Sequence, residues 1–313
     1  MTEYGRQLRK QLDGDDQLVC PGVHDPLTAA VADTVGFDAI YMTGYGTSLS
    51  ATGYPDAGFI TMPEMISNAA NIQERISVPL VADADNGYGN ATNVVRTVRE
   101  YIKAGVGAIH IEDQTFPKRC GHTEGRQVIP REEAVGKIQA AAEVRTERAE
   151  EFVLIARTDA RGTGDGSLEE AIIRANAFLD AGADVAFVEG PTDESELQRI
   201  GAEVEGPLLY NFVGDLGTSP YVDLGTLEEL GFEMVIFPIA ATLATIASVH
   251  QNLQAFAEDP VDAMRQIDTQ FNEQDIGSLH EFSGFPEVIE WEQRYLPDED
   301  REKYEGSLGD SIQ

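Results

Sequence analysis

Short apolar runs rich in valine and isoleucine alternate along the chain with longer amphipathic stretches. Each apolar run has the length of a buried strand, and each longer stretch has the length and spacing of a helix. Strands that alternate with helices are typical of βαβ units and therefore of a parallel sheet. Eight strands are predicted, at residues 18–21, 38–43, 80–85, 108–113, 152–159, 185–189, 208–212 and 234–238.

Helices are predicted between these strands, among them residues 63–75, 91–104, 131–148 and 167–181. The motifs AGVGA, at 104–108, and AGADV, at 181–185, place a glycine at a helix C-terminus just before a strand. Eight such units in about 240 residues predict an α/β fold, a (β/α)8 barrel of the TIM type.

After residue 238 the pattern is helical to residue 257, and again over 261–271 and 280–296. We therefore predict a single barrel domain over residues 1–313, with residues 245–313 as a helical C-terminal extension. The last segment is rich in aromatic residues, namely Phe282, Phe285, Trp291 and Tyr295. Such residues suit packing against the barrel and also contact with another subunit, and the sequence leaves both interpretations open.

The chain carries 55 acidic residues against 22 basic ones, of which five are lysines, and its formal net charge is −33. An acidic surface repels nucleic acid and anionic lipid, so we expect neither as a partner. Self-repulsion destabilises the folded state at low salt, whereas at molar salt the Debye length falls to about 3 Å. This composition predicts adaptation to a salt-rich cytoplasm, as in halophiles.

No feature of the sequence predicts export or membrane insertion. No apolar run approaches the roughly 20 residues that cross a bilayer, and residues 1–14 lack the apolar core of a signal peptide. Two cysteines, Cys20 and Cys120, do not make a disulfide framework in a chain of 313 residues. We expect a cytoplasmic protein in a reducing compartment.

Polar residues gather at the C-terminal ends of the predicted strands, where the active sites of barrels lie. Six successive strand ends carry them: Tyr41, Thr43, Asp83, Asp85, Glu112, Asp113, Arg157, Asp159, Glu189 and Asn211. One acid after a strand commonly caps a helix, but capping does not explain six successive strand ends. The sequence therefore predicts an active site at this end of the barrel.

Asp83 and Asp85 share one strand and point the same way, since side chains on a strand alternate with a period of two. Paired carboxylates repel each other unless a cation or a proton lies between them. Glu112, on the next strand, adds a further oxygen ligand, and oxygen ligands favour Mg²⁺ or Mn²⁺ over zinc. We interpret His110 as a hydrogen-bonded residue of the barrel interior.

The segment PKRCGHTEG, residues 117–125, follows the fourth strand and is called the lid segment below. Its cationic residues, Lys118, Arg119 and a protonated His122, are expected to lower the pKa of the Cys120 thiol. Its glycines are expected to let the segment move as a lid. A cationic lid over a metal suits a substrate that carries several carboxylates.

Residues 43–58, TGYGTSLSATGYPDAG, are predicted to form a glycine-rich loop whose N–H groups can hold anionic oxygens. Neither this loop nor DNGYGN, at 85–90, has the signature of a dinucleotide site or of a P-loop. We therefore expect no nucleotide cofactor.

Together these motifs resemble the isocitrate lyase and phosphoenolpyruvate mutase superfamily. The matching stretches, in the family's order from residue 40 to 212, are IYMTGYG, GYPDAG, VADADNGYG, IHIEDQ, KRCGH, IARTDAR, VEG and YNF. The KRCGH motif resembles the corresponding loop in the carbon–carbon lyase branch of the superfamily. The resemblance implies a small tricarboxylic acid substrate, a Mg²⁺ cofactor that Mn²⁺ can replace, and a homotetramer with exchanged C-terminal helices.

The resemblance also implies a role for each matching residue. Tyr41 is implied as the base for the substrate hydroxyl and Cys120 as the acid that protonates the product carbanion, with Lys118 and His122 as their catalytic neighbours. The implied metal-site residues are Asp83 and Asp85, with Asp56 and Glu112 around them. The implied substrate contacts are Thr43, Gly44, Tyr45, Gly121, Arg157, Glu189 and Asn211.

Departures from the family's pattern bear on the substrate. Tyr45 resembles the aromatic residue of isocitrate lyases, and Leu243 and Phe271 replace arginines of bacterial methylisocitrate lyases. Phe187, however, stands where isocitrate lyases carry tryptophan and leaves room for a methyl group. We expect cleavage of isocitrate to glyoxylate and succinate, as in a glyoxylate bypass. The alternatives are 2-methylisocitrate cleavage, oxaloacetate hydrolysis or another malate-type cleavage.

Overall fold

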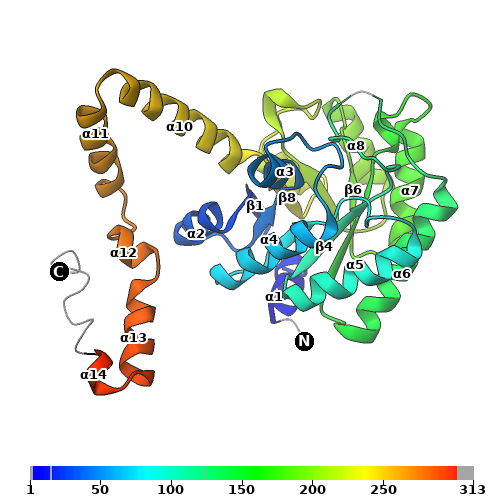
Figure 1. Ribbon diagram of the computed structural model, residues 1–313. Coiled ribbons are helices and arrows are strands. Elements are labelled where there is room, and N and C mark those ends of the chain that lie inside the picture. Colours follow the sequence, from blue (N-terminus) through cyan, green and yellow to red (C-terminus); the bar gives the residue numbers. More distant parts are fainter. Residues whose placement is uncertain (1–2, 15, 124, 302–313) are drawn as a thin grey trace. The chain divides into compact units, whose positions relative to one another are not determined.

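The computed structural model describes residues 3–14, 16–123 and 125–301, and eight parallel strands form a closed barrel within it (Figure 1). The strands pair in chain order, and the eighth also pairs with the first. The predicted (β/α)8 barrel is therefore confirmed. The strands are β1 (Leu18–Val23), β2 (Ile40–Met42), β3 (Leu80–Asp83), β4 (Ala108–Glu112), β5 (Val153–Thr158), β6 (Val185–Val188), β7 (Leu208–Asn211) and β8 (Met234–Phe237).

Helices surround the barrel, and local capping signals set their ends. Asp25 begins α2 by accepting the N–H of Thr28 at 2.8 Å, and Gly36 ends it with a φ of 88°. The helices of this part of the chain are α1 (Glu3–Leu12), α2 (Pro26–Val35), α3 (Gly44–Thr52), α4 (Met62–Arg75), α5 (Ala91–Ala104), α6 (Arg131–Arg148), α7 (Leu168–Asp180), α8 (Glu194–Glu203) and α9 (Leu224–Glu229), with the short 3₁₀ helices η1 (Ala160–Gly162) and η2 (Gly214–Leu216).

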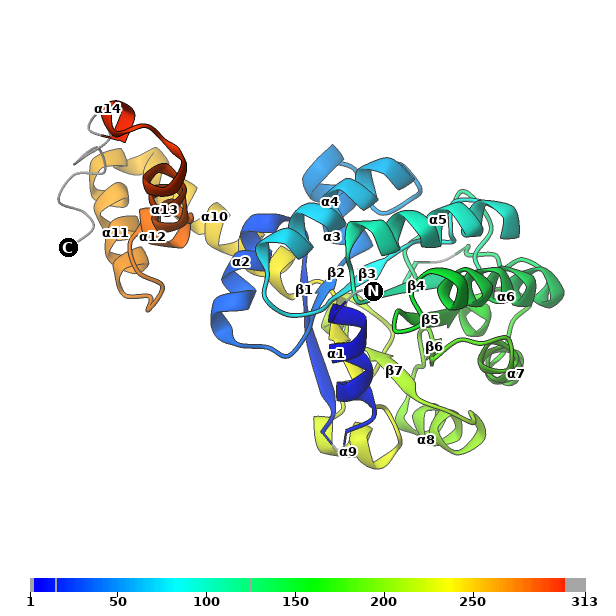
Figure 2. The same cartoon turned by 90° about the horizontal axis from the view of Figure 1, so that it is seen from below.

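The core has an inner and an outer part. Inside the barrel, residues such as Val81, Ile155 and Phe187 form one buried cluster, which Leu8 of α1 joins. The helix α1 lies across one end of the barrel (Figure 2). Apolar residues between the strands and the helices form two further clusters. Apolar side chains fill the barrel interior. The polar residues therefore gather at the C-terminal ends of the strands, where the βα loops lie.

Contacts divide the chain into two compact units, Met1–Ala244 and Thr245–Gln313. The second unit contains most of α10 (Ala240–Glu258), together with α11 (Pro260–Asn272), α12 (Leu279–Phe282), α13 (Phe285–Tyr295) and α14 (Asp298–Arg301). On α10 the apolar side chains of Ile246, Val249 and Leu253 are at least half exposed. Among the described residues, no helix has both the length and the apolar character that a membrane span requires.

One predicted element needs correction, because the glycine-rich stretch after β2 is partly helical. Residues 44–52 form α3, whose first turn is capped by Thr43 Oγ1 accepting the N–H of Gly46 at 3.3 Å. Gly46 permits close packing, since a Cβ there would lie 2.5 Å from Thr242 Oγ1. The N–H groups that the sequence assigned to a loop therefore belong to a helix N-terminus.

Candidate active site

Backbone donors hold the first of the two paired aspartates. Asp83, the last residue of β3, accepts the N–H of Gly44 at 3.1 Å and the N–H of Asp85 at 2.8 Å. Asp85 follows in a turn with a φ of 48°, a region that residues other than glycine seldom occupy. Both carboxylates are buried, so the turn after β3 presents two acids in a fixed arrangement.

Lys118 brings the lid segment to these acids. Its Nζ lies 2.5 Å from Asp85 Oδ1 and 2.7 Å from Asp56 Oδ1, and all three side chains are buried. The sequence placed this cation beside the Cys120 thiol, whereas the structure pairs it with carboxylates. Asp56, Asp83, Asp85 and Glu112 are called the acidic cluster below. Asp56 binds the lid segment through Lys118.

The acidic cluster fits a divalent cation. Glu112 Oε1 is buried with no hydrogen-bond partner among the described residues, and burial raises the pKa of Glu112 well above its usual value. Burial, with the nearby charges of Asp83 and Asp56, also raises the pKa of Asp85 to about 6 against the opposing effect of Lys118. No three potential ligands converge on one point in the described part of the chain. Mg²⁺ commonly takes one or two carboxylates and keeps several waters, so one or two of the acids Asp83, Asp85 and Glu112, together with waters, can hold it.

Tyr41 and His110 form a hydrogen-bonded pair beside Asp83. His110 Nε2 lies 2.8 Å from the Tyr41 hydroxyl and 3.4 Å from Asp83 Oδ1. Burial, followed by the charge of Asp83, raises the pKa of Tyr41 well above its usual value, so the phenol keeps its proton at rest. His110 is therefore part of the site rather than only of the barrel interior. The sequence offered one signal for this role, since His110 lies two residues before Glu112 on β4.

Arg157, Glu189 and Asn211 come together at the C-terminal ends of the next three strands. Arg157 Nη2 lies 3.4 Å from Glu189 Oε2, and Glu189 also contacts His122 Nε2 at 2.8 Å and Asn211 Nδ2 at 3.1 Å. Burial opposes ionisation of Glu189, but Arg157 and His122 hold the pKa of this carboxyl below its usual range. These residues form a polar cluster that can bind a substrate carboxylate.

The pKa of the Cys120 thiol, in the lid segment, shifts in the direction opposite to the prediction. Burial raises the pKa of Cys120, and this effect exceeds the lowering by the His122 backbone N–H. The predicted net lowering of the pKa is therefore wrong, since burial outweighs the cations, and Lys118 is paired with Asp56 and Asp85. A protonated thiol suits a proton donor better than a nucleophile. Both cysteines are free.

The substrate contacts implied by the resemblance lie around this centre. Gly121 packs so closely that a Cβ there would lie 2.1 Å from Arg157 Nη2. Thr43 is buried at the N-terminus of α3, while Tyr45 is 37% exposed. The residues predicted from the strand ends and from the lid segment thus meet at one end of the barrel.

The chain matches the family model for phosphoenolpyruvate phosphomutase over residues 8–257. It belongs to the phosphoenolpyruvate mutase and isocitrate lyase superfamily. A 2,3-dimethylmalate lyase of Eubacterium barkeri is 47% identical over 244 residues, which cover 78% of this chain and 83% of the relative. The isocitrate lyase of Haloferax volcanii is 35% identical over 317 residues, with 98% of this chain and 91% of the relative covered.

Solved structures of similar proteins hold small dicarboxylates. Oxaloacetate acetylhydrolase in complex with 3,3-difluorooxalacetate superposes with a TM-score of 0.85 at 36% identity, covering 93% of this chain and 97% of that one. Phosphonopyruvate hydrolase in complex with oxalate and Mg²⁺ superposes with a TM-score of 0.82 at 30% identity, covering 95% and 100%. This superfamily member is therefore an enzyme of lyase type.

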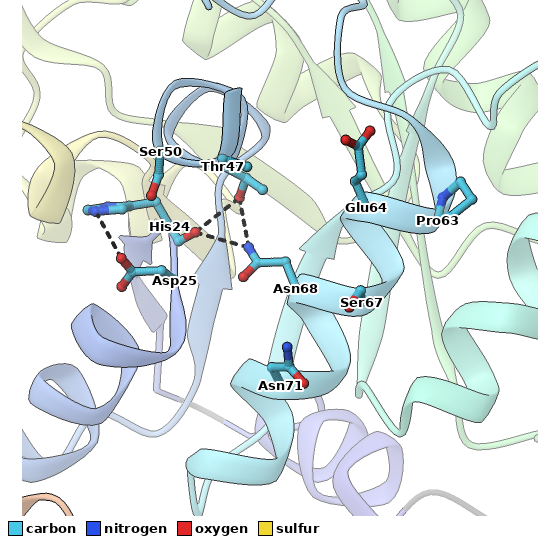
Figure 3. Close-up of a pocket in the computed structure, with 10 residues that line it drawn as sticks. His24, Asp25, Thr47, Ser50, Pro63, Glu64, Ser67, Asn68 and Asn71 are labelled. Carbon is cyan, nitrogen blue, oxygen red and sulfur yellow. Dashed lines mark hydrogen bonds and ion pairs between the residues drawn. The ribbon is translucent and has the colours of Figure 1, made fainter. Parts of the chain in front are cut away.

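The helix that carries Gly44 is anchored beside a pocket of about 500 Å³ (Figure 3). Asn68 of α4 donates from Nδ2 to the carbonyl oxygen of His24 at 3.0 Å and to Thr47 Oγ1 of α3 at 3.2 Å. Figure 3 shows these bonds tying α3 and α4 to the end of β1. The N–H of Gly44, which donates to Asp83, lies at the start of this same helix, α3.

Proposed function

We propose that this protein is a Mg²⁺-dependent carbon–carbon lyase that cleaves a 2-methyl-substituted malate into pyruvate and a monocarboxylate. The balance of charge in the site carries this proposal. Three cationic side chains, Lys118, Arg126 and Arg157, contact five buried carboxylates, those of Asp56, Asp85, Glu112, Asp159 and Glu189. A tricarboxylate would bring a third negative charge to a barrel end where acids already outnumber cations, whereas a malate brings two.

Phe187 supports a methyl group on the hydroxyl-bearing carbon. This side chain is fully buried, with its ring 5.0 Å from the Arg157 guanidinium and 5.8 Å from the His110 ring. It is smaller than the tryptophan of isocitrate lyases, so the site has room for the methyl group of a tertiary alcohol. The relative from Eubacterium barkeri is a lyase of such a malate.

The chain's own residues can carry the proton transfers of a retro-aldol cleavage. Tyr41 takes the proton of the substrate hydroxyl while passing its own to His110 Nε2, 2.8 Å away. The C2–C3 bond breaks, the hydroxyl carbon becomes the carbonyl of pyruvate, and the electron pair moves into an enediolate. Cys120 then gives its thiol proton to the carbanion carbon. Residues among Asp83, Asp85 and Glu112 would hold Mg²⁺, which when bound would supply Lewis-acid stabilisation of the developing charge.

Isocitrate is the second candidate substrate. The isocitrate lyase of Haloferax volcanii aligns over 98% of this chain, and Tyr45 resembles the aromatic residue of isocitrate lyases. In that case the products are glyoxylate and succinate.

A side-by-side assay tests the proposal. 2,3-Dimethylmalate, isocitrate, 2-methylisocitrate and oxaloacetate are incubated with the enzyme and Mg²⁺ in molar KCl. We expect pyruvate to form fastest from 2,3-dimethylmalate. Faster glyoxylate release would replace the proposal by isocitrate cleavage, faster pyruvate release from 2-methylisocitrate would favour a tricarboxylate, and oxalate with acetate would indicate hydrolysis of oxaloacetate.

We further propose that the enzyme is a homotetramer in a salt-rich cytoplasm. The exposed apolar side chains of Ile246, Val249 and Leu253 on α10 support a subunit contact. Light scattering after size exclusion in molar KCl measures the mass. A monomer would remove this part of the proposal.

A further inference from the structure

One carboxylate fixes the orientation of Arg157. Asp159 accepts from Arg157 Nε at 2.9 Å and from Nη2 at 3.0 Å, a two-point contact that sets the plane of the guanidinium. Asp159 is fully buried, and its own N–H donates to Asp113 Oδ1 at 2.9 Å. These bonds hold Asp159 in place, and Asp159 in turn sets the orientation of the Arg157 guanidinium.

A second arginine reaches the same carboxylate from the far end of the lid segment. Arg126, the residue after that segment, donates from Nη1 to Asp159 Oδ1 at 3.1 Å and is 7% exposed. The backbone beside it is paired, because the N–H of Thr115 donates to the carbonyl oxygen of Gln127 at 2.9 Å. Arg126 thus joins the base of the lid segment to the support of Arg157.

Gly162 provides the space in which the Arg126 side chain lies. A Cβ at this position would lie 1.8 Å from Arg126 Nη2 and 2.5 Å from its Cζ. Arg126 Nη2 also donates to the carbonyl oxygen of Gly162 at 3.4 Å. The absence of a side chain at residue 162 is therefore necessary for the observed position of Arg126.

We propose that Arg126 is a positioning residue that, through Asp159, couples the seating of the lid segment to the orientation of Arg157. Two contacts support the coupling, since Gly121 of the lid segment packs against Arg157 Nη2 and Arg126 holds the carboxylate behind it. The inference rests on the proposed function in one respect, that Arg157 binds a substrate carboxylate. Without Arg126, Asp159 loses one of its charged partners and the lid segment loses its anchor on this side.

The experiment uses three variants and a matched control. Arg126→Met removes the charge, and Arg126→Lys keeps it. Gly162→Ala displaces the Arg126 side chain without changing any charge, and the φ of Gly162 is not in the left-handed region. Gly164→Ala, two residues further on, is the control, because a Cβ there meets no atom within 4 Å.

Two readouts are taken on the full chain in molar KCl. Calorimetric titration with oxalate in the presence of Mg²⁺ measures binding of a two-carboxylate probe. Hydrogen exchange of peptides covering residues 114–128, without oxalate, measures the seating of the lid segment. A purely structural role would lower only the melting temperature.

We expect Arg126→Met and Gly162→Ala to raise the Kd for oxalate on the order of tenfold and to speed exchange over residues 114–128. Arg126→Lys should restore most of the affinity, and Gly164→Ala should match the wild type. If Arg126→Met does not fold, Gly162→Ala decides. Wild-type affinity and exchange in Gly162→Ala overturn the inference. If the wild-type protein binds no oxalate, the proposed function loses its support, while the exchange experiment still decides on the coupling.

Discussion

The substitution Gly44→Ala tests whether Asp83 must stay where the backbone holds it. An added Cβ would lie 2.3 Å from Asp83 Oδ2 and 2.9 Å from its Cγ, whereas real Cβ atoms essentially never approach other atoms within 3.0 Å. The carboxylate must therefore move by about 0.7 Å or more. Its hydrogen bond from the N–H of Gly44, 3.1 Å long, would be lost or distorted.

The size of the effect follows from this displacement. A misplacement of about 1 Å in a catalytic arrangement can cost about 10²-fold in rate, and a hydrogen bond to a charged group contributes about 1.5–3 kcal/mol. We expect kcat/KM to fall by about 100-fold and the affinity for Mn²⁺ by about tenfold. The fold should persist, because the φ of Gly44 is not in the left-handed region.

Turnover as a function of Mg²⁺ concentration and Mn²⁺ binding by electron paramagnetic resonance measure both effects. Gly136→Ala in α6 is the control, since a Cβ there meets no atom within 4 Å. Wild-type turnover and Mn²⁺ affinity in Gly44→Ala would refute the idea that this contact positions Asp83 for the metal.

Three further predictions concern the acid, the metal and the salt. Because burial raises the pKa of the Cys120 thiol and an acid must carry its proton, kcat should hold at neutral pH and fall as the pH rises through that pKa. Cys120→Ser should lower kcat by about 10²-fold or more with Mn²⁺ affinity unchanged, and nearly normal turnover would exclude the acid role. A chelator should abolish turnover, and added Mg²⁺ or Mn²⁺ should restore it; activity that survives chelation contradicts the metal assignment. The net charge of −33 should make the melting temperature rise from about 0.1 M to molar KCl, and a flat profile would argue against salt adaptation.

The barrel was predictable because its signals are local. Strand length, helix spacing and the glycine caps, of which Gly105 has a φ of 85°, can be read over a few residues. The helix after β2 was missed because its glycines favour a loop locally, and the tertiary packing that explains them, of Gly44 against Asp83 and of Gly46 against Thr242, cannot be read from the local sequence. The pKa of Cys120 was predicted with the wrong sign because it is set mainly by burial of the thiol, which depends on tertiary packing, and because Lys118 pairs with Asp56, 62 residues away, instead of lying free beside the thiol.

Buried ion pairs on both sides of Cys120 connect the two halves of the site. Lys118, two residues before the thiol, contacts Asp85, one of the acids that can hold the metal, and Arg126, six residues after it, contacts the carboxylate behind Arg157. Such pairs contribute little net stability, because desolvation offsets most of their attraction, but breaking one is costly. What these ion pairs contribute here is a fixed geometry. A proton donor anchored to both halves keeps its position relative to the metal acids and to the carboxylate-binding arginine, and a carbanion formed between them requires this arrangement.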